Sequence, residues 1–313
     1  MSLLNIAWYN LENLFEPGEH PNLKNKWTQT RYNKKVKNIA SVIAEMFNGD
    51  GPDLLGVCEV QSETVLDDVI AELPNSGAYS VVHHDSPDMR LIDVGFIYRK
   101  SVISNPAAAA YNIRKRYPTR DILKVEFTVN NGKKIYVIGN HWPSRSGWQY
   151  SSEPYRIMVA ENCAWITGEL YKDDPEVNIL VMGDFNDEPF NRSVQEYLYA
   201  IRNKERVQAR RNSKKARPYL YNLSWNLMDK QTPGTYFYSS NPAGWNMLDQ
   251  IMISKGLLTG TNWLEVIDDS FTIFRPKRIR KGSTPKPFRM KRNNTWEEGF
   301  SDHFAILAEI NIL

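Results

Sequence analysis

Acidic, amide and imidazole side chains stand directly beside apolar runs of strand length along the whole sequence. One group follows its runs: Asn10, Glu12, Glu59, Asn140, His141, Asp184 and Asn186. Another group precedes its runs: Asp93, Asp249, Asp302 and His303. If the strands of the second group run antiparallel to those of the first, all of these side chains meet at one edge of the sheets. Open α/β sheets commonly bind their ligands at such an edge.

The residue types in this cluster suit metal-assisted chemistry. Carboxylate and amide oxygens are hard ligands for Mg²⁺ or Mn²⁺, and Glu59 with Asn10 or Asp302 nearby is enough for one ion that also binds substrate phosphate. His141 and His303 are two of only five histidines in the chain. A histidine beside a buried carboxylate is held in one tautomer, so that one imidazole can take a proton from water while the other binds a developing negative oxygen. Together these groups predict hydrolysis of a phosphate ester.

The apolar runs that position these groups are typical of strands, because several are rich in β-branched residues and are bounded by Gly, Asn, Asp or Pro. They are Leu3–Tyr9, Leu54–Cys58, Val94–Tyr98, Leu123–Val129, Ile135–Gly139, Ile179–Met182, Gln250–Ser254 and Phe304–Ile312. Asn130–Gly132 predicts a hairpin turn between the fourth and fifth runs. Helical spacing of apolar residues predicts helices over Tyr32–Phe47, Thr64–Leu73 and Tyr155–Leu170, with Glu153–Pro154 as the start of the last one.

Hairpins mixed with strand–helix–strand units predict mixed sheets and an α/β (α+β) fold. The strands are too numerous for one comfortable open sheet, so we expect two mixed sheets packed face to face with helices outside. No internal repeat or linker divides the sequence, and we expect a single domain over residues 1–313.

The composition is that of an ordinary globular protein, with 42% hydrophobic and 24% charged residues. Only two cysteines occur, Cys58 and Cys163, which excludes a disulfide framework; we expect both to be buried. No apolar run is long enough to cross a bilayer, and Leu3–Asn10 predicts a strand rather than a signal peptide. A soluble protein is expected, either cytoplasmic or exported with its leader removed, and the sequence leaves the compartment open.

The net charge of +3 is unevenly spread. Arg202–Arg217 holds eight basic residues against one acidic residue, and Arg275–Arg292 holds nine against none. Such a polarised chain suits an anionic partner, for example the backbone of a nucleic acid. The alternative is that both segments are solvated loops.

Six segments in order carry a family resemblance: Trp8–Phe15, Glu59, Gly139–Trp142, Gly183–Asp187, Leu248–Ile251 and Ser301–His303. They resemble the motifs of the endonuclease/exonuclease/phosphatase superfamily of DNase I-like nucleases, apurinic endonucleases, inositol polyphosphate 5-phosphatases and neutral sphingomyelinases. The resemblance runs from residue 8 to residue 303. It implies a four-layer α/β sandwich and divalent-metal-dependent hydrolysis of phosphoesters, with Mg²⁺ or Mn²⁺ as the cofactor.

The resemblance also implies a metal site. Asn10 and Glu59 match the family's metal-site residues, with Glu59 as the principal carboxylate ligand. Asp302 matches the neighbouring carboxylate that shapes the metal or phosphate site. Glu12 falls where the apurinic branch has an aspartate near the metal.

The catalytic groups follow in the same way. Asp184 and Asn186 match the pair that orients the nucleophile and contacts the scissile phosphate. Asp249 and His303 match the Asp–His dyad. His141 matches the second catalytic histidine of the DNase I-like branch, which is paired there with an acid from an earlier strand.

Four further residues are candidates around this centre. Asp93, directly before its strand, is the expected acid partner of His141. Trp142 follows that histidine and is a candidate for contact with the substrate. Arg90 and Arg145 are candidates for gripping a phosphate by bidentate contact.

We therefore expect a monomeric phosphoester hydrolase, a nuclease or general phosphodiesterase. One alternative is a phosphatase or phosphodiesterase for small or lipid phosphoesters of the inositol phosphate or sphingomyelin type. Another is a catalytically silent protein that binds nucleic acid or a membrane surface through the two basic segments.

Overall fold

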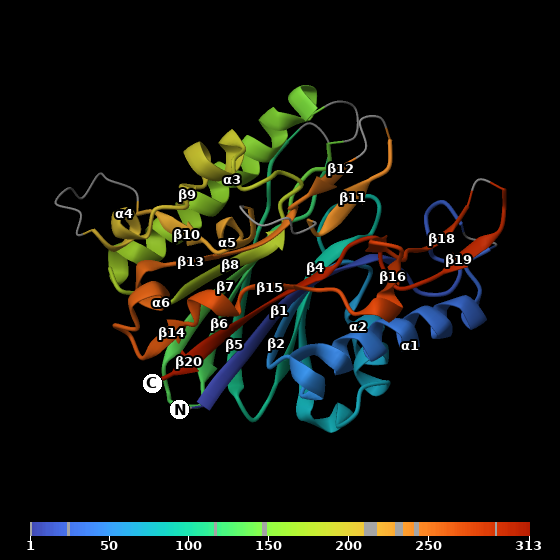
Figure 1. Ribbon diagram of the computed structural model, residues 1–313, viewed down its shortest axis with the longest axis horizontal. Helices are drawn as coiled ribbons and strands as arrows, with labels where there is room; N and C mark the ends of the chain where they lie inside the picture. Colours follow the sequence, from blue (N-terminus) through green and yellow to red (C-terminus); the bar gives the residue numbers. More distant parts are fainter. Residues whose placement is uncertain are drawn as a thin grey trace.

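The computed structural model of the chain describes residues 2–23, 26–115, 118–145, 149–209, 218–228, 234–240, 244–291 and 293–313. Within these residues two mixed sheets lie face to face, with helices on their outer sides (Figure 1). The helices are α1 (Gln29–Glu45), α2 (Glu63–Ala71), α3 (Gln149–Asp173), α4 (Lys204–Gln208), α5 (Trp225–Met228) and α6 (Lys255–Thr259). None of them, over the part of the chain described, is both long and apolar enough to cross a membrane.

The first sheet is built around the N-terminal strand. Its order is β14 (Leu264–Val266), β20 (Ala305–Ile312), β1 (Ser2–Leu14), β2 (Leu54–Val60), β4 (Asp93–Arg99) and β3 (Tyr79–His84), with β15 (Thr272–Phe274) also paired to β20. β1 and β2 are parallel, whereas β20 is antiparallel to β1 and β4 is antiparallel to β2. Helices α1 and α2 cover this sheet from outside (Figure 1).

The second sheet mixes strand directions in the same way. Its order is β5 (Ile103–Tyr111), β6 (Ile122–Val129), β7 (Lys134–His141), β8 (Ile179–Asp184), β13 (Asp249–Ile253), β10 (Leu220–Asn222) and β9 (Ala200–Ile201). β7 and β8 are parallel, and β13 is antiparallel to β8. The long helix α3 covers the outer face through an apolar layer that includes Val159 and Cys163 on the helix and Ile138 and Val181 on the sheet.

Three two-stranded hairpins lie outside the sheets. They are β11 (Tyr236–Tyr238) with β12 (Gly244–Asn246), β16 (Arg280–Lys281) with β17 (Thr284–Pro285), and β18 (Phe288–Met290) with β19 (Trp296–Glu298). The segment from residue 275 to residue 291, which is strongly basic in the sequence, thus forms ordered hairpins beside α1 (Figure 1). Half of the other basic segment, residues 210–217, lies outside the described residues.

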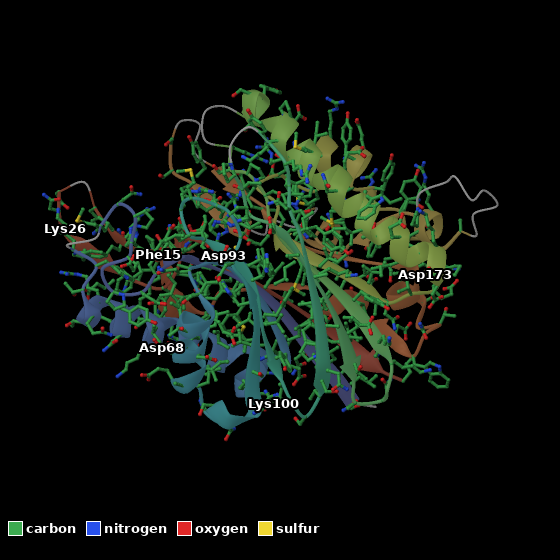
Figure 2. The ribbon with its side chains drawn as sticks, turned by 180° about the vertical axis from the view of Figure 1, so that it is seen from behind. Phe15, Lys26, Asp68, Asp93, Lys100 and Asp173 are labelled. Carbon is green, nitrogen blue, oxygen red and sulfur yellow. The ribbon has the colours of Figure 1, made fainter. Side chains whose placement is uncertain are left out.

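The strand directions bring the predicted polar groups to one edge of the sandwich. The C-terminal ends of β1, β2, β7 and β8 meet the N-terminal ends of β4, β13 and β20 there, as the antiparallel pairings require. Figure 2 labels a residue at each end of β4. Asp93, at the start of the strand, lies at the polar edge of the sandwich, and Lys100, just after the strand, lies at the opposite edge. The sequence-based prediction of a common edge is confirmed.

Glycines allow the two sheets to approach closely. A Cβ atom on Gly56 of β2 would lie 2.4 Å from Cε3 of Trp8 and 2.8 Å from Sδ of Met182 in the other sheet. A Cβ atom on Gly139 of β7 would lie 2.7 Å from Val94 in the first sheet. The core between the sheets is therefore packed at contact distance, which leaves little freedom for the strand ends that carry the polar groups.

Several elements differ from the sequence-based prediction, among them β3, β9, β10, β14 and β15, which no predicted run covers. Helix α3 begins at Gln149, so the prediction that Pro154 marks its start is wrong; a proline this near the start removes only one hydrogen bond of the helix. Strand β5 was not predicted, because its run of alanines from residue 107 to residue 110 lacks the β-branched residues typical of strands. It lies at the edge of its sheet, where Pro106 is tolerated.

We predict that Gly56→Ala and Gly168→Ala change stability in opposite directions. Alanine at position 56 collides with Trp8 and Met182, and overpacking of this kind typically costs about 1–3 kcal/mol of unfolding free energy. Gly168 lies inside α3 with no atom within 4 Å of an added Cβ, so alanine there stabilises the helix by about 1 kcal/mol. Urea unfolding of both variants measures the difference, and a neutral or stabilising Gly56→Ala would contradict the close packing of the sheets.

Candidate active site

An asparagine amide bridges a half-buried carboxylate and a buried one at the polar edge. Nδ2 of Asn10, at the end of the regular part of β1, donates to Oε1 of Glu59 at 3.3 Å and to Oδ2 of Asp184 at 3.1 Å. Its oxygen accepts a hydrogen bond from the backbone N–H of Glu12 at 2.9 Å, which fixes the orientation of the amide. Asn10 thus joins an acid of the first sheet to an acid of the second and presents its nitrogen to both.

The backbone is bent at the point where β1 and β2 present these groups. Glu12, Asn13 and Glu59 all have positive φ angles, of 50°, 57° and 60°, which is uncommon for residues other than glycine. The bend lets the backbone N–H of Asn13 donate to Oε2 of Glu59 at 3.0 Å. It is held from behind by the buried ammonium group of Lys35, which donates to the carbonyl of Glu12, and by the backbone N–H of Phe288, which donates to the Glu12 carboxylate at 2.6 Å.

The carboxylate of Glu12 is buried and holds the bend in place instead of contacting a ligand. It is only 5% exposed, and burial raises the pKa of its carboxyl to about 8. Strain of this kind is kept where the surrounding structure enforces it, and here it fixes the carboxylate of Glu59.

Asp249 and His303 form the predicted dyad across the two sheets. Asp249 begins β13 directly opposite Asp184, and His303 precedes β20. Nδ1 of His303 lies 2.7 Å from Oδ2 of Asp249, while its Nε2 lies 3.9 Å from Oδ2 of Asp184. Although burial lowers the pKa of His303, the Asp249 carboxylate outweighs it and raises the pKa well above the usual value. This imidazole is therefore held as a cation.

His141 is held in the opposite state. Burial, followed by the charges of Arg120 and Arg90, lowers the pKa of His141 well below the usual value, so the imidazole is neutral. Its Nε2 lies 3.8 Å from Glu59 and 3.9 Å from Asp184. Its Nδ1 is buried and has no hydrogen-bond partner among the described residues.

Asp184 occupies the centre of the cluster. Its Oδ1 accepts from the backbone N–H of Asn186 at 2.9 Å, and the Asn186 side chain is held by the carbonyl of Trp142 at 2.9 Å. Burial raises the pKa of Asp184 to about 7, and the nearby carboxylate of Asp249 adds to this, although His303 opposes it. Burial also raises the pKa of Glu59, with Asp302 as the next cause.

This crowding of buried carboxylates fits a divalent cation. One group of candidate metal-binding side chains in the described residues is Asp184, Asp249 and His303, and another contains His141 and Asp184 with Cys58. Buried acids that raise one another's pKa become stable as anions when a positive charge joins them. The carboxylates are hard oxygen ligands, which suits Mg²⁺, Mn²⁺ or Ca²⁺.

Three residues that were predicted to belong to the site do not make the contacts expected of them. Asp93 accepts hydrogen bonds from the backbone and hydroxyl of Ser86 and lies 3.7 Å from His83, and over the described part of the chain it makes no hydrogen bond or ion pair with His141. Trp142 is fully buried against Phe185, with ring centroids 4.8 Å apart. The expectation that its ring contacts a substrate is therefore corrected.

The third is Arg145, whose guanidinium is engaged inside the fold. Its Nε donates to the carbonyl of Asn186 at 2.7 Å, and its Nη2 donates to Asn191 at 3.0 Å. It also lies 3.4 Å from Asp187. Arg145 thus supports the loop that follows β8, and its contact with a phosphate stays a prediction.

Two buried residues that support the site were missed in the sequence. Arg120 donates to the carbonyls of His141 and Trp142 and to the carboxylate of Asp88, and it is 4% exposed. It stands two residues before β6, and a charged residue just before an antiparallel strand was the signal that could have found it. Lys35 gave no signal, because a lysine in an amphipathic helix is normally on the solvated face.

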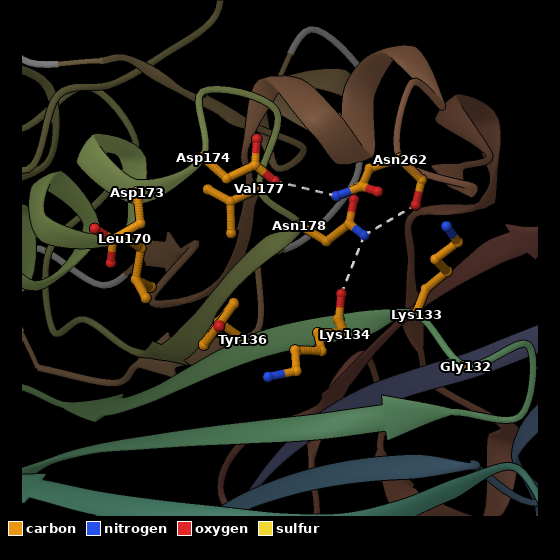
Figure 3. A pocket seen from close by; sticks show the side chains of 10 residues that line it. All are labelled: Gly132, Lys133, Lys134, Tyr136, Leu170, Asp173, Asp174, Val177, Asn178 and Asn262. Carbon is orange, nitrogen blue, oxygen red and sulfur yellow. Dashed lines mark hydrogen bonds between the residues drawn. The ribbon is translucent and has the colours of Figure 1, made fainter.

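The cavity drawn in Figure 3 is separate from this cluster. It has a volume of about 330 Å³ and lies beside Lys134 and Asn178, at the starting ends of β7 and β8. The amide of Asn178 donates there to the carbonyls of Lys134 and Asn262 at 3.1 and 3.2 Å. His141 and Asp184 stand at the other ends of the same two strands, so the cavity is remote from the polar edge.

Comparison with known proteins identifies relatives over the full length of the chain. A sequence model of the Endonuclease/Exonuclease/phosphatase family matches residues 5–312. No curated protein matches the sequence at a significant level.

Solved structures show the same fold at low identity. An endonuclease/exonuclease/phosphatase family protein from Bacteroides thetaiotaomicron is 15% identical with a TM-score of 0.62, covering 100% of this chain and 98% of its own. TDP2 from D. rerio, complexed with a single-strand DNA product, is 15% identical with a TM-score of 0.62 and coverages of 99% and 100%. A mannosyl-6-phosphatase from Bacteroides thetaiotaomicron is 15% identical with a TM-score of 0.61 and coverages of 98% and 99%.

We predict that Asp249→Asn lowers the pKa of His303 toward the ordinary histidine value of about 6.5, because the carboxylate is what stabilises the imidazolium. The raised pKa stabilises the folded state fully below pH of about 6.5, and this contribution is lost as the pH rises through the folded pKa. The wild-type advantage in unfolding free energy is therefore larger at pH 6 than at high pH.

Nitrogen NMR of the imidazole in the metal-free protein measures the titration directly. Asp121→Asn is the matched control, since Asp121 lies 3.2 Å from the partly exposed His84 and not beside His303. An unchanged titration of His303 in Asp249→Asn would contradict the assignment of the dyad.

Proposed function

We propose that the chain, which belongs to the endonuclease/exonuclease/phosphatase family and is a phosphoester hydrolase, cleaves phosphodiester bonds with a bound Mg²⁺ or Mn²⁺ ion. The observation that carries this proposal is that two histidines approach the same carboxylate oxygen of Asp184. Nε2 of His303 and Nε2 of His141 both lie 3.9 Å from Oδ2 of Asp184, and Nδ1 of His303 lies 2.7 Å from Asp249. Their surroundings raise the pKa of His303 and lower that of His141, which suits them to different parts in proton transfer.

The charge of the site favours a diester over a monoester. Among the described residues no lysine or arginine side chain makes a hydrogen bond or ion pair with Glu59, Asp184 or Asp249. A phosphomonoester brings about two negative charges at neutral pH, whereas a diester brings only one. Repulsion from buried carboxylates is therefore smaller for the diester.

The residues divide the reaction between them. His303, with Nδ1 on Asp249, offers its Nε2 proton to an oxygen of the phosphate and stabilises the charge that develops there. Asp184, oriented by the N–H groups of Asn10 and Asn186, accepts a hydrogen bond from the attacking water. Neutral His141 is available to take up or pass on a proton on the side of Glu59.

Glu59 is the proposed principal ligand of the metal ion, with Asp302 as the neighbouring carboxylate. Asn10 holds Glu59 and Asp184 in place through its amide nitrogen. The ion, when bound, supplies positive charge to the phosphate oxygens and the leaving oxygen. Its fit rests on the buried, mutually repelling acids of this edge.

A nucleic acid is the substrate class that we propose. The likeness to TDP2, a protein solved with a single-strand DNA product, supports it, and so does the basic segment beside α1. Part of that segment's charge is neutralised, because Arg278 pairs with Glu45 and Lys281 pairs with Glu297. The electrostatic attraction for a polyanion is thus weaker than the sequence alone indicates.

We predict that Glu59→Gln, Asp184→Asn and His303→Asn each lower the turnover of bis(p-nitrophenyl) phosphate by about 10²–10⁴-fold in the presence of Mg²⁺ or Mn²⁺, the range typical for loss of a general acid–base or electrostatic group. Glu196→Gln is the matched control, because Glu196 pairs with the exposed Arg192 away from the site. EDTA abolishes wild-type turnover. Near-normal rates in any two of the three site variants would overturn the assignment.

Metal binding gives a readout apart from turnover. Titration calorimetry with Mn²⁺ is expected to show an affinity for Glu59→Gln at least about tenfold lower than that of the wild type, since a ligand charge is lost. Substrate class is decided by comparing plasmid DNA, bis(p-nitrophenyl) phosphate and p-nitrophenyl phosphate. Cleavage of the monoester alone would contradict the diester proposal, and binding of DNA without cleavage of any substrate would favour a silent binder.

A further inference from the structure

We propose that Arg90 forms an anion subsite beside the active site, which binds a second phosphate group of the substrate next to the scissile one. This inference rests on the proposed function, since it assumes that the polar edge binds a phosphoester. It implies that the substrate is a molecule with at least two successive phosphate groups, such as a polynucleotide, and not a molecule with one phosphate.

The guanidinium of Arg90 is exposed but held in a fixed orientation. Its Nε and Nη2 donate to the two carboxylate oxygens of Asp88 at 3.0 and 2.8 Å, and its backbone N–H also donates to Asp88 at 3.0 Å. The Arg90 side chain is 54% exposed, whereas that of Asp88 is 4% exposed. A flexible surface arginine would lose much entropy on binding an anion, but this one is already ordered by a buried acid.

Arg120 keeps the positive charge of the subsite from being cancelled. It lies 3.2 Å from the same Asp88 carboxylate, so that two guanidinium groups share one carboxylate and the trio carries a net charge of +1. Arg120 also donates to the carbonyls of His141 and Trp142. The subsite is therefore tied through Asp88 and Arg120 to the strand end that carries a catalytic histidine.

The free edge of Arg90 belongs to the same edge of the sandwich as the active site. Arg90 stands just before Asp93, the first residue of β4 at this edge, and its partner Asp88 is bonded to Arg120, which donates to the carbonyl of His141. Three N–H groups of the guanidinium remain, two on Nη1 and one on Nη2, and within the described residues they make no hydrogen bond. Such a planar fork matches two oxygens of a phosphate.

A second cation lies near this fork. Lys115 is close enough to Arg90 and Arg120 for their charges to lower its pKa, after the effect of burial. Its ammonium group lies 5.0 Å from the ring centroid of Tyr155 at the start of α3. Arg145 is also bonded through Nε and Nη2, to Asn186 and Asn191, but its side chain is 21% exposed whereas that of Arg90 is 54% exposed, so Arg90 is the more open of the two.

The test compares inhibitors that differ by one phosphate. Hydrolysis of bis(p-nitrophenyl) phosphate is inhibited with thymidine 3′,5′-bisphosphate, thymidine 3′-monophosphate and thymidine 5′-monophosphate. In the wild type the inhibition constant of the bisphosphate is expected to be about 10- to 100-fold below that of the better monophosphate, as for one charge-assisted contact. In Arg90→Gln this ratio falls below about threefold, because the second phosphate loses its partner.

Arg192→Gln is the matched control, since Arg192 is also an ordered surface arginine, 56% exposed and paired with Glu196. It is expected to keep the wild-type ratio. The ratio of inhibition constants is taken within each variant, so a change in overall turnover does not affect it. The proposal is overturned if the bisphosphate has no advantage in the wild type, or if Arg90→Gln keeps that advantage.

A failure of the proposed function gives a different result. If the wild type does not hydrolyse the diester, the same three nucleotides are titrated by calorimetry with Mg²⁺ present. A ratio of dissociation constants that depends on Arg90 would then support the subsite although the proposed reaction had failed. A ratio that does not depend on Arg90 would overturn the subsite as well.

Discussion

Negative charge buried between two packed sheets is the constraint around which the polar edge of this protein is organised. Glu59, Asp184 and Asp249 lie where water is largely excluded, and burial raises the pKa of Glu59 and Asp184. The fold offsets this repulsion with hydrogen-bond donors and one cation. The amide of Asn10 bridges two of the acids, and His303 is held as an imidazolium against the third. What remains is an excess of oxygen ligands with negative charge, which is the environment that a hard divalent cation stabilises.

The backbone is shaped to keep these groups in position. Asn13 and Glu59 have positive φ angles at neighbouring strand ends, and a buried lysine, Lys35, fixes the carbonyl of Glu12 between them. Conformations of this kind cost free energy and persist only where packing enforces them. Here the cost is offset by the close contact of the two sheets, since Gly56 and Gly139 leave no room for a Cβ atom. The tightly packed sheets thus hold the strained backbone at this edge in one conformation.

Charged side chains around the site shift the pKa values of the two histidines in opposite directions. Arg120 and Arg90 stand on the side of His141 and contribute to its low pKa, whereas Asp249 stands on the side of His303 and raises its pKa. The same two arginines share the carboxylate of Asp88 and leave one guanidinium open to the surface. One network therefore lowers the pKa of His141 and orients the guanidinium that we propose as a second anion site. Both properties suit the proposed substrate, which carries negative charge beyond the bond to be broken.

The sequence by itself determined the long central strands, the mixed sheets and most of the residues of the polar edge, because strand periodicity and polar residues at strand ends are local properties of the chain. It did not determine edge strands such as β3 and β5, nor every contact between side chains. Asp93 was expected beside His141 and instead accepts from Ser86, and Trp142 was a candidate for contact with the substrate and is buried against Phe185. Arg120 was overlooked, although it anchors Asp88 and two backbone carbonyls. Only the tertiary structure decided these points, since the face to which a side chain turns, and the charge that meets it there, depend on how the surrounding segments pack, and for Arg120 these segments lie more than twenty residues away in the chain.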